Sequence, residues 1–331
     1  MNHRIIESNC DLSDNEIVGI IKEKIRKPDD LNLKSMALLF FNPSTRTRLS
    51  FIKALNVLNM NPVSLSPLEL RYLDGESLRD TALSISQYVD IIGLRINGAR
   101  PIHSSLSVPA YTIVNDYFKN FAKAAECPVI NLECDKFHPC QGLADLKTIA
   151  DQIGLKNVSK FTVSWAYSSN ALRVQAMPIE LIILLTRFIP HTVLSCPTEF
   201  MLKGKFIDIA KANAEKNNNQ FSITHDFKEG CDNAKVIYAR NWVTSNISNH
   251  GLESEKEIHR RYDHWKLTDS LFSSVAKTAN YMHCLPVHRG CEAESSVIDS
   301  PRSLIREQMK NRVTVQVELL KLLLGGSYER G

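Results

Sequence analysis

Short apolar segments alternate with longer segments of helical periodicity along most of the chain. The apolar segments predict strands at residues 36–41, 89–94, 128–132, 161–165, 192–196, 221–224, 235–239 and 280–284. This alternation is typical of parallel sheets wrapped by helices. The pattern therefore predicts an α/β protein with two doubly wound, Rossmann-like parallel-sheet domains and a cleft between them.

A break in the helical pattern predicts the domain boundary. Apolar residues recur at helical spacing from Leu143 to Ile153, and the segment Gly154 to Asn157 then breaks the pattern. Near the end of the chain, residues 312–325 form a helix too apolar to stand alone, which we expect to pack back on the first domain. The predicted domains are therefore residues 1–152 with this helix, and residues 153–311.

Composition narrows the class of protein. The 331 residues carry 40 Lys and Arg against 36 Asp and Glu, a formal charge of +4, which argues against a nucleic-acid partner. No segment approaches the roughly 20 apolar residues of a membrane helix, and residues 1–7 lack the apolar centre of a secretory signal. Eight cysteines without a CxxC pair are typical of reduced thiols. We therefore predict a soluble cytoplasmic protein without a membrane partner.

The segment after the apolar residues 36–41 carries hydroxyl and guanidinium groups. Ser44 and Thr45 supply the hydroxyls, and Arg46 and Arg48 supply positive charge. The first turn of a helix that starts here offers unpaired N–H groups and the positive end of the helix dipole. The segment therefore predicts a phosphate site. A solvated helix start with one of the hydroxyls as an ordinary N-cap is the alternative that these residues leave open.

Polar side chains also follow four other predicted strands. They are Arg95, the segment Glu133 to Gln141, the segment Arg240 to Trp242, and the segment His283 to Pro286. Each group alone has an ordinary explanation, as a surface ion pair or as buried core residues. Because the carboxyl ends of parallel strands meet at one edge of a sheet, we expect these groups to converge on one site.

Cys134, His138 and Cys140 lie close enough in the sequence to raise the question of a metal site. No second pair of ligands follows at the spacing of a zinc finger. We therefore predict no metal site.

Three motifs together resemble a known family. They are Ser44-Thr45-Arg46-Thr47-Arg48, His138-Pro139-Cys140-Gln141 and His283-Cys284-Leu285-Pro286. In this order they resemble the signature of the carbamoyltransferases that act on ornithine and its derivatives. Cys284 favours the ornithine branch over the aspartate branch. The resemblance covers nearly the whole chain, through Asn311 and Arg312, and implies that the first domain binds carbamoyl phosphate and the second binds an amino acid.

The resemblance also implies roles for individual residues. The implied contacts to carbamoyl phosphate are Ser44, Thr45, Arg46, Thr47, Arg95, His138, Gln141, Cys284, Leu285 and Arg312, of which Arg46, Arg95, His138 and Cys284 are catalytic. The implied contacts to the amino acid are Glu133, Trp165, Arg240 and Leu285. Family members are trimers in which a neighbouring subunit's loop completes each site, so we expect a homotrimer with the loop Leu70 to Arg79 in that role.

The chemistry of carbamoyl transfer fits these residue types. Attack of an amine on the carbonyl of a mixed anhydride creates a developing oxyanion, and Thr47, Arg95 and His138 are suited to hold it. Arg46 and Arg312 can neutralise the phosphate that leaves. The reaction needs no redox or metal cofactor, and we predict none.

Two segments indicate the acceptor amine. Residues 161–169, with Trp165, and residues 236–242 resemble the branch that carbamoylates N-acylated ornithines, whose second domain is knotted. The segment 170–178 would be the threaded loop of a possible trefoil knot. We therefore predict an N-acetylornithine carbamoyltransferase of arginine biosynthesis.

This chain also departs from the acyl-ornithine branch. Arg240 replaces a lysine, His288 replaces an arginine, and residues 73–80 lack a tryptophan found in that branch. Ornithine or another amine as the acceptor is therefore an alternative within the enzyme class. A non-catalytic paralogue that only binds carbamoyl phosphate or assembles with a partner is the alternative from another class.

Overall fold

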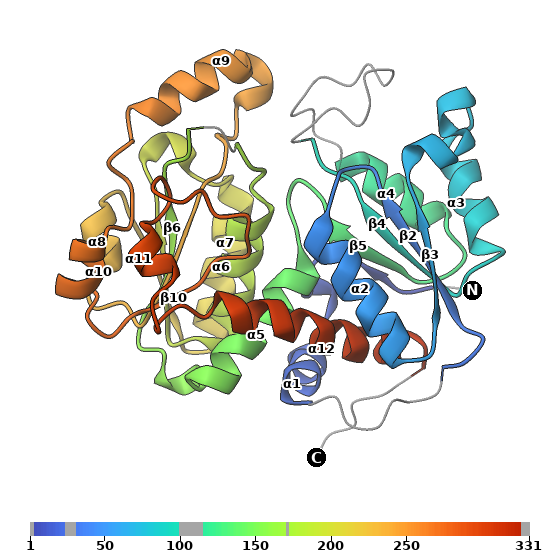
Figure 1. Ribbon diagram of the computed structural model, residues 1–331, viewed down its shortest axis with the longest axis horizontal. Coiled ribbons are helices and arrows are strands. Elements are labelled where there is room, and N and C mark those ends of the chain that lie inside the picture. Colours follow the sequence, from blue (N-terminus) through green and yellow to red (C-terminus); the bar gives the residue numbers. More distant parts are fainter. Residues whose placement is uncertain (1–2, 24–30, 99–114, 170–171, 326–331) are drawn as a thin grey trace. The chain divides into compact units, whose positions relative to one another are not determined.

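The computed structural model describes residues 3–23, 31–98, 115–169 and 172–325 (Figure 1). The chain divides into two compact units, a first unit of residues 1–144 and 310–331 and a second unit of residues 145–309. The division falls inside two helices, α5 (Pro139–Gln152) and α12 (Ile305–Leu323), each of which contributes residues to both units. We retain the domain limit after residue 152, where α5 ends, as a proposal.

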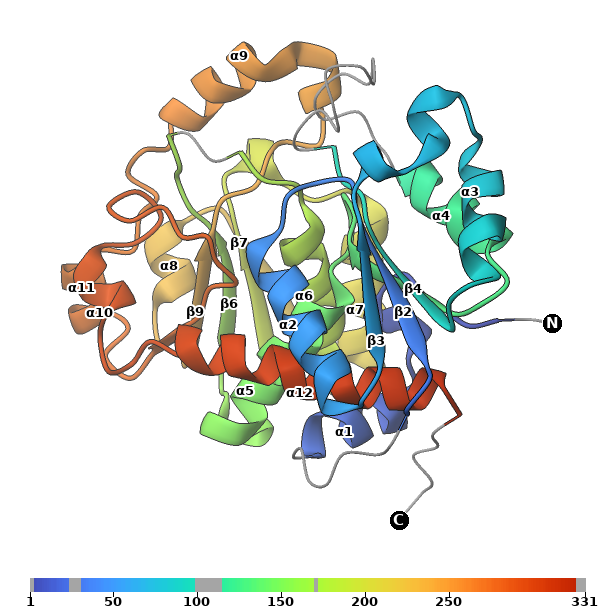
Figure 2. The same cartoon turned by 45° about the vertical axis from the view of Figure 1, so that its right-hand side comes forward.

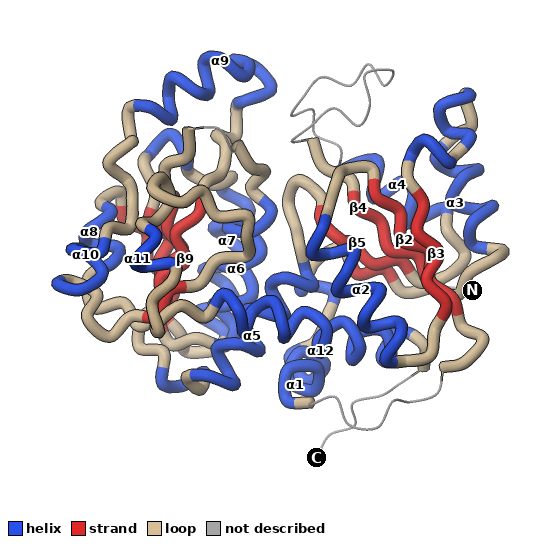
Figure 3. Tube along the Cα trace, viewed as in Figure 1, coloured by secondary structure: helices blue, strands red, loops and turns tan. Residues whose placement is uncertain are grey.

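The first unit contains one five-stranded parallel sheet, drawn in red in Figure 3. Its strands are β1 (Ile5–Ile6), β2 (Ser35–Phe40), β3 (Asn61–Leu65), β4 (Ile91–Arg95) and β5 (Val129–Glu133), in the spatial order β1-β5-β4-β2-β3. Its other helices are α1 (Asp14–Lys22), α2 (Thr45–Val57), α3 (Leu78–Ser86) and α4 (Asn115–Ala124), with 3₁₀ turns at Asn9–Asp11, Pro67–Glu69 and Arg71–Asp74.

The central strands of this sheet are buried on both faces, which explains their continuous apolar runs. On one face, Leu39 and Leu94 belong to a core cluster with Ala82 of α3 and with Phe118 and Phe121 of α4. Helix α2 covers the opposite face (Figures 1 and 2). The ends of the strands, rather than their faces, are therefore where a ligand would meet this sheet.

Two strands of the first unit were not among the predicted ones. β1 is only two residues long, and β3 contains Pro62 and has three exposed residues. β3 lies at the edge of the sheet, where a proline is tolerated because one side of the strand has no partner. Neither strand has the apolar run by which the others were recognised.

The second unit contains another five-stranded parallel sheet. Its strands are β6 (Phe161–Trp165), β7 (His191–Ser195), β8 (Gln220–Thr224), β9 (Val236–Arg240) and β10 (Asn280–Tyr281), in the order β10-β9-β6-β7-β8. Its other helices are α6 (Ala176–Phe188), α7 (Gly204–Lys216), α8 (Phe227–Cys231), α9 (Ile247–Arg260), α10 (Asp269–Ser274) and α11 (Ser295–Ile298), with 3₁₀ turns at Leu155–Asn157 and Thr198–Phe200.

Helix α6 is the most deeply buried helix segment of the second unit's core. Its residues from Ala176 to Thr186 are all buried, and α7 packs beside it on one face of the sheet (Figures 1 and 2). A helix that is apolar on all sides needs partners on all sides, which explains the run Leu181 to Leu185.

The predicted α/β architecture of two parallel sheets with flanking helices is confirmed. The last helix does pack on the first unit, through Arg312 and Gln316. The expected threaded loop includes residues 170–171, which lie outside the described residues. Among the helices that the structure describes, none combines the length and the apolar character needed to cross a bilayer.

Candidate active site

The strand order of the first unit changes direction between β2 and β4. The strand after β2 lies on one side of it, whereas β4 and β5 follow on the other side. Ligands of doubly wound sheets bind at the carboxyl ends of the two strands at such a switch point. Two asparagines join these ends: Asn42 Nδ2 donates to the Asn97 carbonyl over 2.9 Å, and Asn97 N donates to Asn42 Oδ1 over 2.7 Å.

Helix α2 starts at this edge with an uncapped first turn. Ser44 occupies the N-cap position in an extended conformation, but its hydroxyl makes no capping hydrogen bond. The first turn contains no acidic residue, and it includes Arg46, which is half-buried. A helix N-terminus without a side-chain cap favours an anion. Ser44 therefore does not act as an ordinary hydroxyl N-cap in this structure.

The second arginine of this segment has another partner. The guanidinium of Arg48 lies over the ring of Phe40, 4.5 Å from the ring centre. This cation–π contact commits Arg48 to the packing of α2 on β2. Of the two arginines in this segment, Arg46 is therefore the one that we still predict to contact phosphate.

Arg312 of α12 connects two of the predicted motifs. It donates to Gln141 Oε1 over 2.5 Å and to Thr47 Oγ1 over 2.8 Å, and all three side chains are buried. One helical turn later, Gln316 donates to Ser50 Oγ over 3.0 Å. The fork of the guanidinium thus joins the first turn of α2 to the first turn of α5.

Arg95 and Glu133 end neighbouring strands. They lie side by side in the parallel register of β4 and β5 and form a close, largely buried ion pair. Asn97 Nδ2 also donates to Glu133 Oε2, over 3.4 Å. Within the described part of the chain, the buried Nε–H of Arg95 has no hydrogen-bond partner. A ligand oxygen is the kind of group that would satisfy it.

His138 lies at the start of α5. Its ring is buried, and its carbonyl oxygen accepts hydrogen bonds from Gln141 N and Gly142 N over 3.0 and 3.1 Å. His138 and Gln141 are therefore held in one helical turn. The side-chain oxygen of Gln141 accepts the hydrogen bond from Arg312, so of its side-chain atoms only the amide nitrogen can donate.

Cys134, beside this turn, has the properties of a core residue. It accepts a hydrogen bond from Asn131 Nδ2 over 3.2 Å, and burial raises the pKa of its thiol to about 12. A protonated, buried thiol is a poor metal ligand. In the ranges covered by the structure, no group of three His, Cys, Asp or Glu side chains is arranged to hold a metal ion.

The second unit has its own switch point, between β6 and β9. Trp165 and Arg240 end these two strands and are partners in the parallel register. Arg240 is buried, with only 5% of its surface exposed. An arginine in this position can meet a carboxylate at the strand ends.

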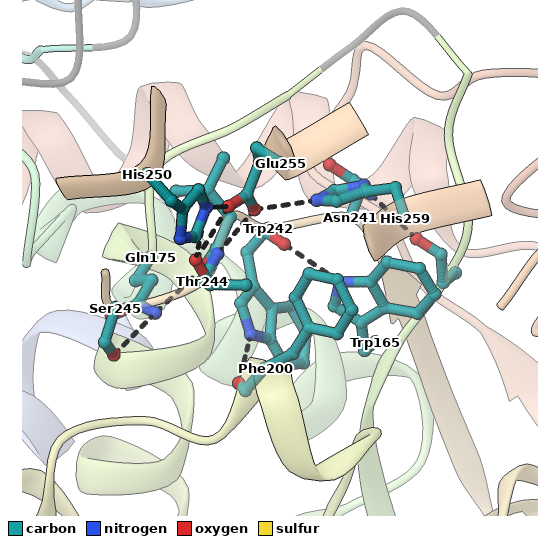
Figure 4. A network of polar contacts seen from close by, with 12 residues as sticks. Trp165, Gln175, Phe200, Asn241, Trp242, Thr244, Ser245, His250, Glu255 and His259 are labelled. Atoms are coloured by element: carbon teal, nitrogen blue, oxygen red, sulfur yellow. Dashed lines mark hydrogen bonds and ion pairs between the residues drawn. The ribbon is translucent and has the colours of Figure 1, made fainter. Parts of the chain in front are cut away.

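Trp165 is part of the core of the second unit, as Figure 4 shows. Its ring stacks on Phe200 with centres 4.3 Å apart, and its Nε1 donates to the Trp242 carbonyl over 2.8 Å. Trp242 Nε1 donates in turn to the Phe200 carbonyl over 2.9 Å. The structure therefore places Trp165 as a support for the loop after Arg240.

A buried carboxylate holds the other end of that loop. Glu255 of α9 accepts hydrogen bonds from Thr244 N and Thr244 Oγ1, both over 2.7 Å (Figure 4). The rings of His250 and His259 contact the same carboxylate at 2.7 and 2.9 Å. Burial opposes the ionisation of Glu255, but these hydrogen bonds outweigh it and lower its pKa. The position of the segment from Asn241 to Thr244 thus depends on the side chains of Trp165 and Glu255.

The segment His283 to Pro286 follows β10 and is also held by side chains. His283 N donates to Gln308 Oε1 over 2.8 Å, and Leu285 N donates to His283 Nδ1 over 2.9 Å. Leu285 has a left-handed backbone with φ of 57°, which a leucine adopts only when its surroundings impose it. Cys284 between them is buried. Burial lowers the pKa of His283, so its ring is neutral.

Sequence reasoning missed the charged residues behind this segment. Arg173 Nη1 donates to Glu292 Oε1 over 2.5 Å, and neither residue belongs to a motif. The two positions are 119 residues apart, so no local pattern marks the pair. His288, predicted as a departure from the acyl-ornithine branch, has its Nδ1 2.9 Å from Ser168 Oγ.

The predicted residues therefore fall into separate groups within each unit. In the first unit, Arg312 joins Thr47 and Gln141, and Arg95 pairs with Glu133, while Ser44, Thr45 and Arg46 form the adjoining helix start. In the second unit, Arg240 adjoins Trp165, and Cys284 and Leu285 share one loop.

Family models match both halves of the chain. Residues 12–151 match the model described as the aspartate/ornithine carbamoyltransferase carbamoyl-P binding domain. Residues 175–323 match the aspartate/ornithine carbamoyltransferase Asp/Orn binding domain.

Relatives and solved structures agree with these models. The chain is 33% identical to an ornithine carbamoyltransferase of Pyrococcus horikoshii, over 92% of this chain and 88% of the relative. It is 31% identical to an N-acetylornithine carbamoyltransferase of Xanthomonas campestris, over 90% of this chain and 89% of the relative. A crystal structure of acetylornithine transcarbamylase complexed with acetylcitrulline is 28% identical, with a TM-score of 0.87 over 98% of this chain and all of the other. With matches of this extent, the chain belongs to the aspartate/ornithine carbamoyltransferase family.

Proposed function

We propose that this protein transfers the carbamoyl group of carbamoyl phosphate to the side-chain amine of N-acetylornithine, a step of arginine biosynthesis that yields N-acetylcitrulline and phosphate. Family membership supports the reaction type. The similar structure with bound acetylcitrulline and the Xanthomonas relative support the acceptor. The observation that carries the reaction is the buried contact of Arg312 with Thr47 and Gln141 beside the uncapped start of α2.

The leaving phosphate is the first charge that the site must stabilise. We assign this role to the N–H groups and hydroxyls of Ser44 and Thr45, and to the charges of Arg46 and Arg312. A helix N-terminus and two guanidinium groups together neutralise a departing dianion better than either does alone.

The second charge that the site must stabilise develops on the carbonyl oxygen of carbamoyl phosphate. Thr47, Arg95 and His138 are assigned to the negative charge that develops on it, and Gln141 to the carbamoyl amide group. Donors fixed before the reaction need no reorganisation as the charge appears, and one such donor typically contributes about 3 kcal/mol. The Arg95 Nε–H, which has no hydrogen-bond partner among the residues that the structure describes, supports this assignment.

The acceptor amine attacks the carbonyl carbon. A C–N bond forms, the C–O bond to phosphate breaks, and the amine proton passes to a base. We assign Cys284 and the Leu285 carbonyl to the amine, the departing phosphate to its proton, and Glu133 and Arg240 to the rest of the amino acid. Trp165 acts in this scheme through the loop after Arg240, because its ring lies in the core.

Free ornithine is the second candidate acceptor. The Pyrococcus relative, named an ornithine carbamoyltransferase, is slightly more similar in sequence than the Xanthomonas one. The two candidates differ by an acyl group on the α-nitrogen, which changes the charge of the substrate.

A comparison of acceptors tests the proposal. Purified protein is given carbamoyl phosphate with ornithine, N-acetylornithine or N-succinylornithine, and citrulline derivatives are measured by mass spectrometry. We expect the highest kcat/KM with N-acetylornithine. Turnover of free ornithine alone would reject the proposed acceptor, and no turnover with any of the three would reject the reaction.

We further propose that the protein is a cytoplasmic homotrimer with shared active sites. The segment from Leu70 to Arg79, assigned to a neighbouring site, contains the 3₁₀ turn Arg71–Asp74 and the start of α3. Its polar side chains are largely exposed, as a loop that reaches another subunit requires.

A further inference from the structure

The carboxylate of Glu292 contacts four different residues of the second unit. Its Oε1 accepts from Arg173 Nη1 over 2.5 Å and from Asn241 N over 2.8 Å, and it lies 3.3 Å from His283 Nε2. Its Oε2 accepts from His288 N over 2.6 Å. No part of the Glu292 side chain is exposed. One fully buried charge therefore contacts residues beside both Arg240 and Cys284.

Arg173 extends these contacts to the same two loops. Its Nη2 donates to the Pro286 carbonyl over 2.5 Å, directly after Leu285. Its own carbonyl accepts from Val243 N over 2.9 Å, in the loop after Arg240. Removing either charge would leave the other buried without its partner, which is strongly unfavourable.

His283 transmits the contact to Leu285. Because Leu285 N donates to His283 Nδ1, that nitrogen carries no proton and the neutral ring holds its proton on Nε2. Nε2 then donates to Glu292. The carboxylate thereby selects the His283 tautomer whose Nδ1 can accept a hydrogen bond from Leu285 N. This hydrogen bond helps to hold the left-handed backbone of Leu285.

We propose that Glu292, paired with Arg173, is the positioning residue for the amino-acid substrate, because it fixes the Cys284–Leu285 loop and the loop after Arg240 in one geometry. The inference rests on the proposed function for its substrate, but not on which amine is the acceptor. Neither residue touches substrate in this scheme. Both act through the backbone groups and the His283 ring that they hold.

Activity measurements separate positioning from general support. In Glu292→Gln, we expect kcat/KM for the acceptor to fall by at least about 100-fold, while the Kd for carbamoyl phosphate, measured by calorimetry, stays within about threefold. Glu292→Asp, which keeps the charge on a shorter side chain, should recover part of the loss. Glu180→Gln is the matched control: it makes the same change in an equally buried carboxylate, which lies on α6 outside both loops, and its kcat should stay within about threefold of wild type.

A double variant excludes a purely structural role. Arg173→Met with Glu292→Leu replaces the ion pair by apolar side chains, so thermal stability should recover relative to either single variant. The acceptor kcat/KM should nevertheless stay low, because the Asn241, His288 and Pro286 backbone groups still lack their partners. A double variant with wild-type turnover would overturn the proposal, as would equal losses in Glu180→Gln and Glu292→Gln.

Hydrogen exchange tests the inference without any activity. In Glu292→Gln, the amides of Asn241, Leu285 and His288 should exchange at least about tenfold faster than in wild type, whereas Glu255→Gln should affect Thr244 instead. Unchanged exchange at these three amides would overturn the positioning role even if no acceptor is turned over. Faster exchange together with an inactive wild type would instead reject the proposed function alone.

Discussion

Arg312 uses the two ends of its guanidinium on two different partners. The oxygens of Gln141 and Thr47 are 2.5 and 2.8 Å from its two terminal nitrogens, and the side chain is buried. An ammonium group is a single point and cannot reproduce this fork.

Arg312→Lys should therefore weaken carbamoyl phosphate binding by about 10- to 100-fold, or about 1.4–2.8 kcal/mol. Titration calorimetry with carbamoyl phosphate measures the change. Arg306→Lys makes the same substitution at an exposed position of α12 and should leave the affinity unchanged. Equal affinities of wild type and Arg312→Lys would show that the fork is dispensable.

Glu292 makes the stability of the protein depend on pH. Burial alone would raise its pKa, but the charge of Arg173 and the contact with His283 outweigh burial and lower it from 4.5 to about 2. A carboxylate with a lowered pKa in the folded state stabilises the fold above its unfolded pKa, and this stabilisation is lost as the pH falls from 4.5 towards 2.

The contribution amounts to about 3 kcal/mol, since each pKa unit corresponds to about 1.4 kcal/mol. The free energy of unfolding in urea should therefore differ most between wild type and Glu292→Gln near pH 7. The difference should shrink between pH 4.5 and the lowest pH at which the protein stays folded. A difference that is constant with pH would mean that folding does not shift the pKa of Glu292.

Helix α9 contains a break at Gly251, which has φ of 78° and ψ of 174°. This backbone conformation is open essentially to glycine alone. The break separates His250 from Glu255 and His259 along the helix, and all three side chains meet at the Glu255 carboxylate. The bend thus allows one short element to surround a buried charge.

Gly251→Ala should lower the free energy of unfolding by about 1–3 kcal/mol. No atom lies within 4 Å of a Cβ built there, so the cost comes from backbone strain and not from a clash. Gly204 at the start of α7 is the control, because it has the same open space without a positive φ, and Gly204→Ala should stabilise slightly. Similar effects of the two substitutions in urea unfolding would contradict the assignment.

At the level of elements, the sequence predicted those strands that consist of a continuous apolar run. Strands such as β2 and β6 lie within one residue of their predicted positions, because both faces are buried and every residue is apolar or small. β1 and β3 were not predicted, because β1 is only two residues long and β3 is a partly exposed edge strand. β10 is also shorter than predicted, because His283 turns to side-chain partners rather than continuing the ladder.

The candidate site divides in the same way. Thr47, Gln141 and Arg312 were found because each lies in a local motif, and the structure joins them. The ion pair of Glu292 and Arg173 could not be predicted from the sequence, because it joins segments that lie far apart along the chain. Trp165 was recognised as a feature of the branch, yet its ring lies in the core, which sequence similarity alone does not distinguish from a ligand contact.

At the scale of the whole molecule, the first unit presents apolar side chains to solvent. Leu49 of α2, Val63 of β3 and Leu68 of the turn Pro67–Glu69 are 62, 40 and 64% exposed. Contact with another protein chain would cover such exposed apolar side chains. They support the proposal that the first unit carries the contacts between subunits of a trimer.

If active sites are shared between subunits, two inactive variants should restore activity when they assemble into one trimer. Arg46→Ala should inactivate a site from within its own chain, whereas Arg79→Ala, which changes an exposed residue of the loop Leu70 to Arg79, should inactivate the neighbour's site. When the two variants are co-expressed and the mixed trimers are purified through two different tags, some sites receive both intact contributions. Every mixed trimer has one site of its three in which a chain with an intact Arg46 adjoins a neighbour with an intact Arg79, so the purified particles should have about one third of the wild-type activity. Light scattering should report three chains per particle in every sample. Mixed particles no more active than the sum of the two separate variants would show that each chain completes its own site, and would remove the loop from the proposed active site.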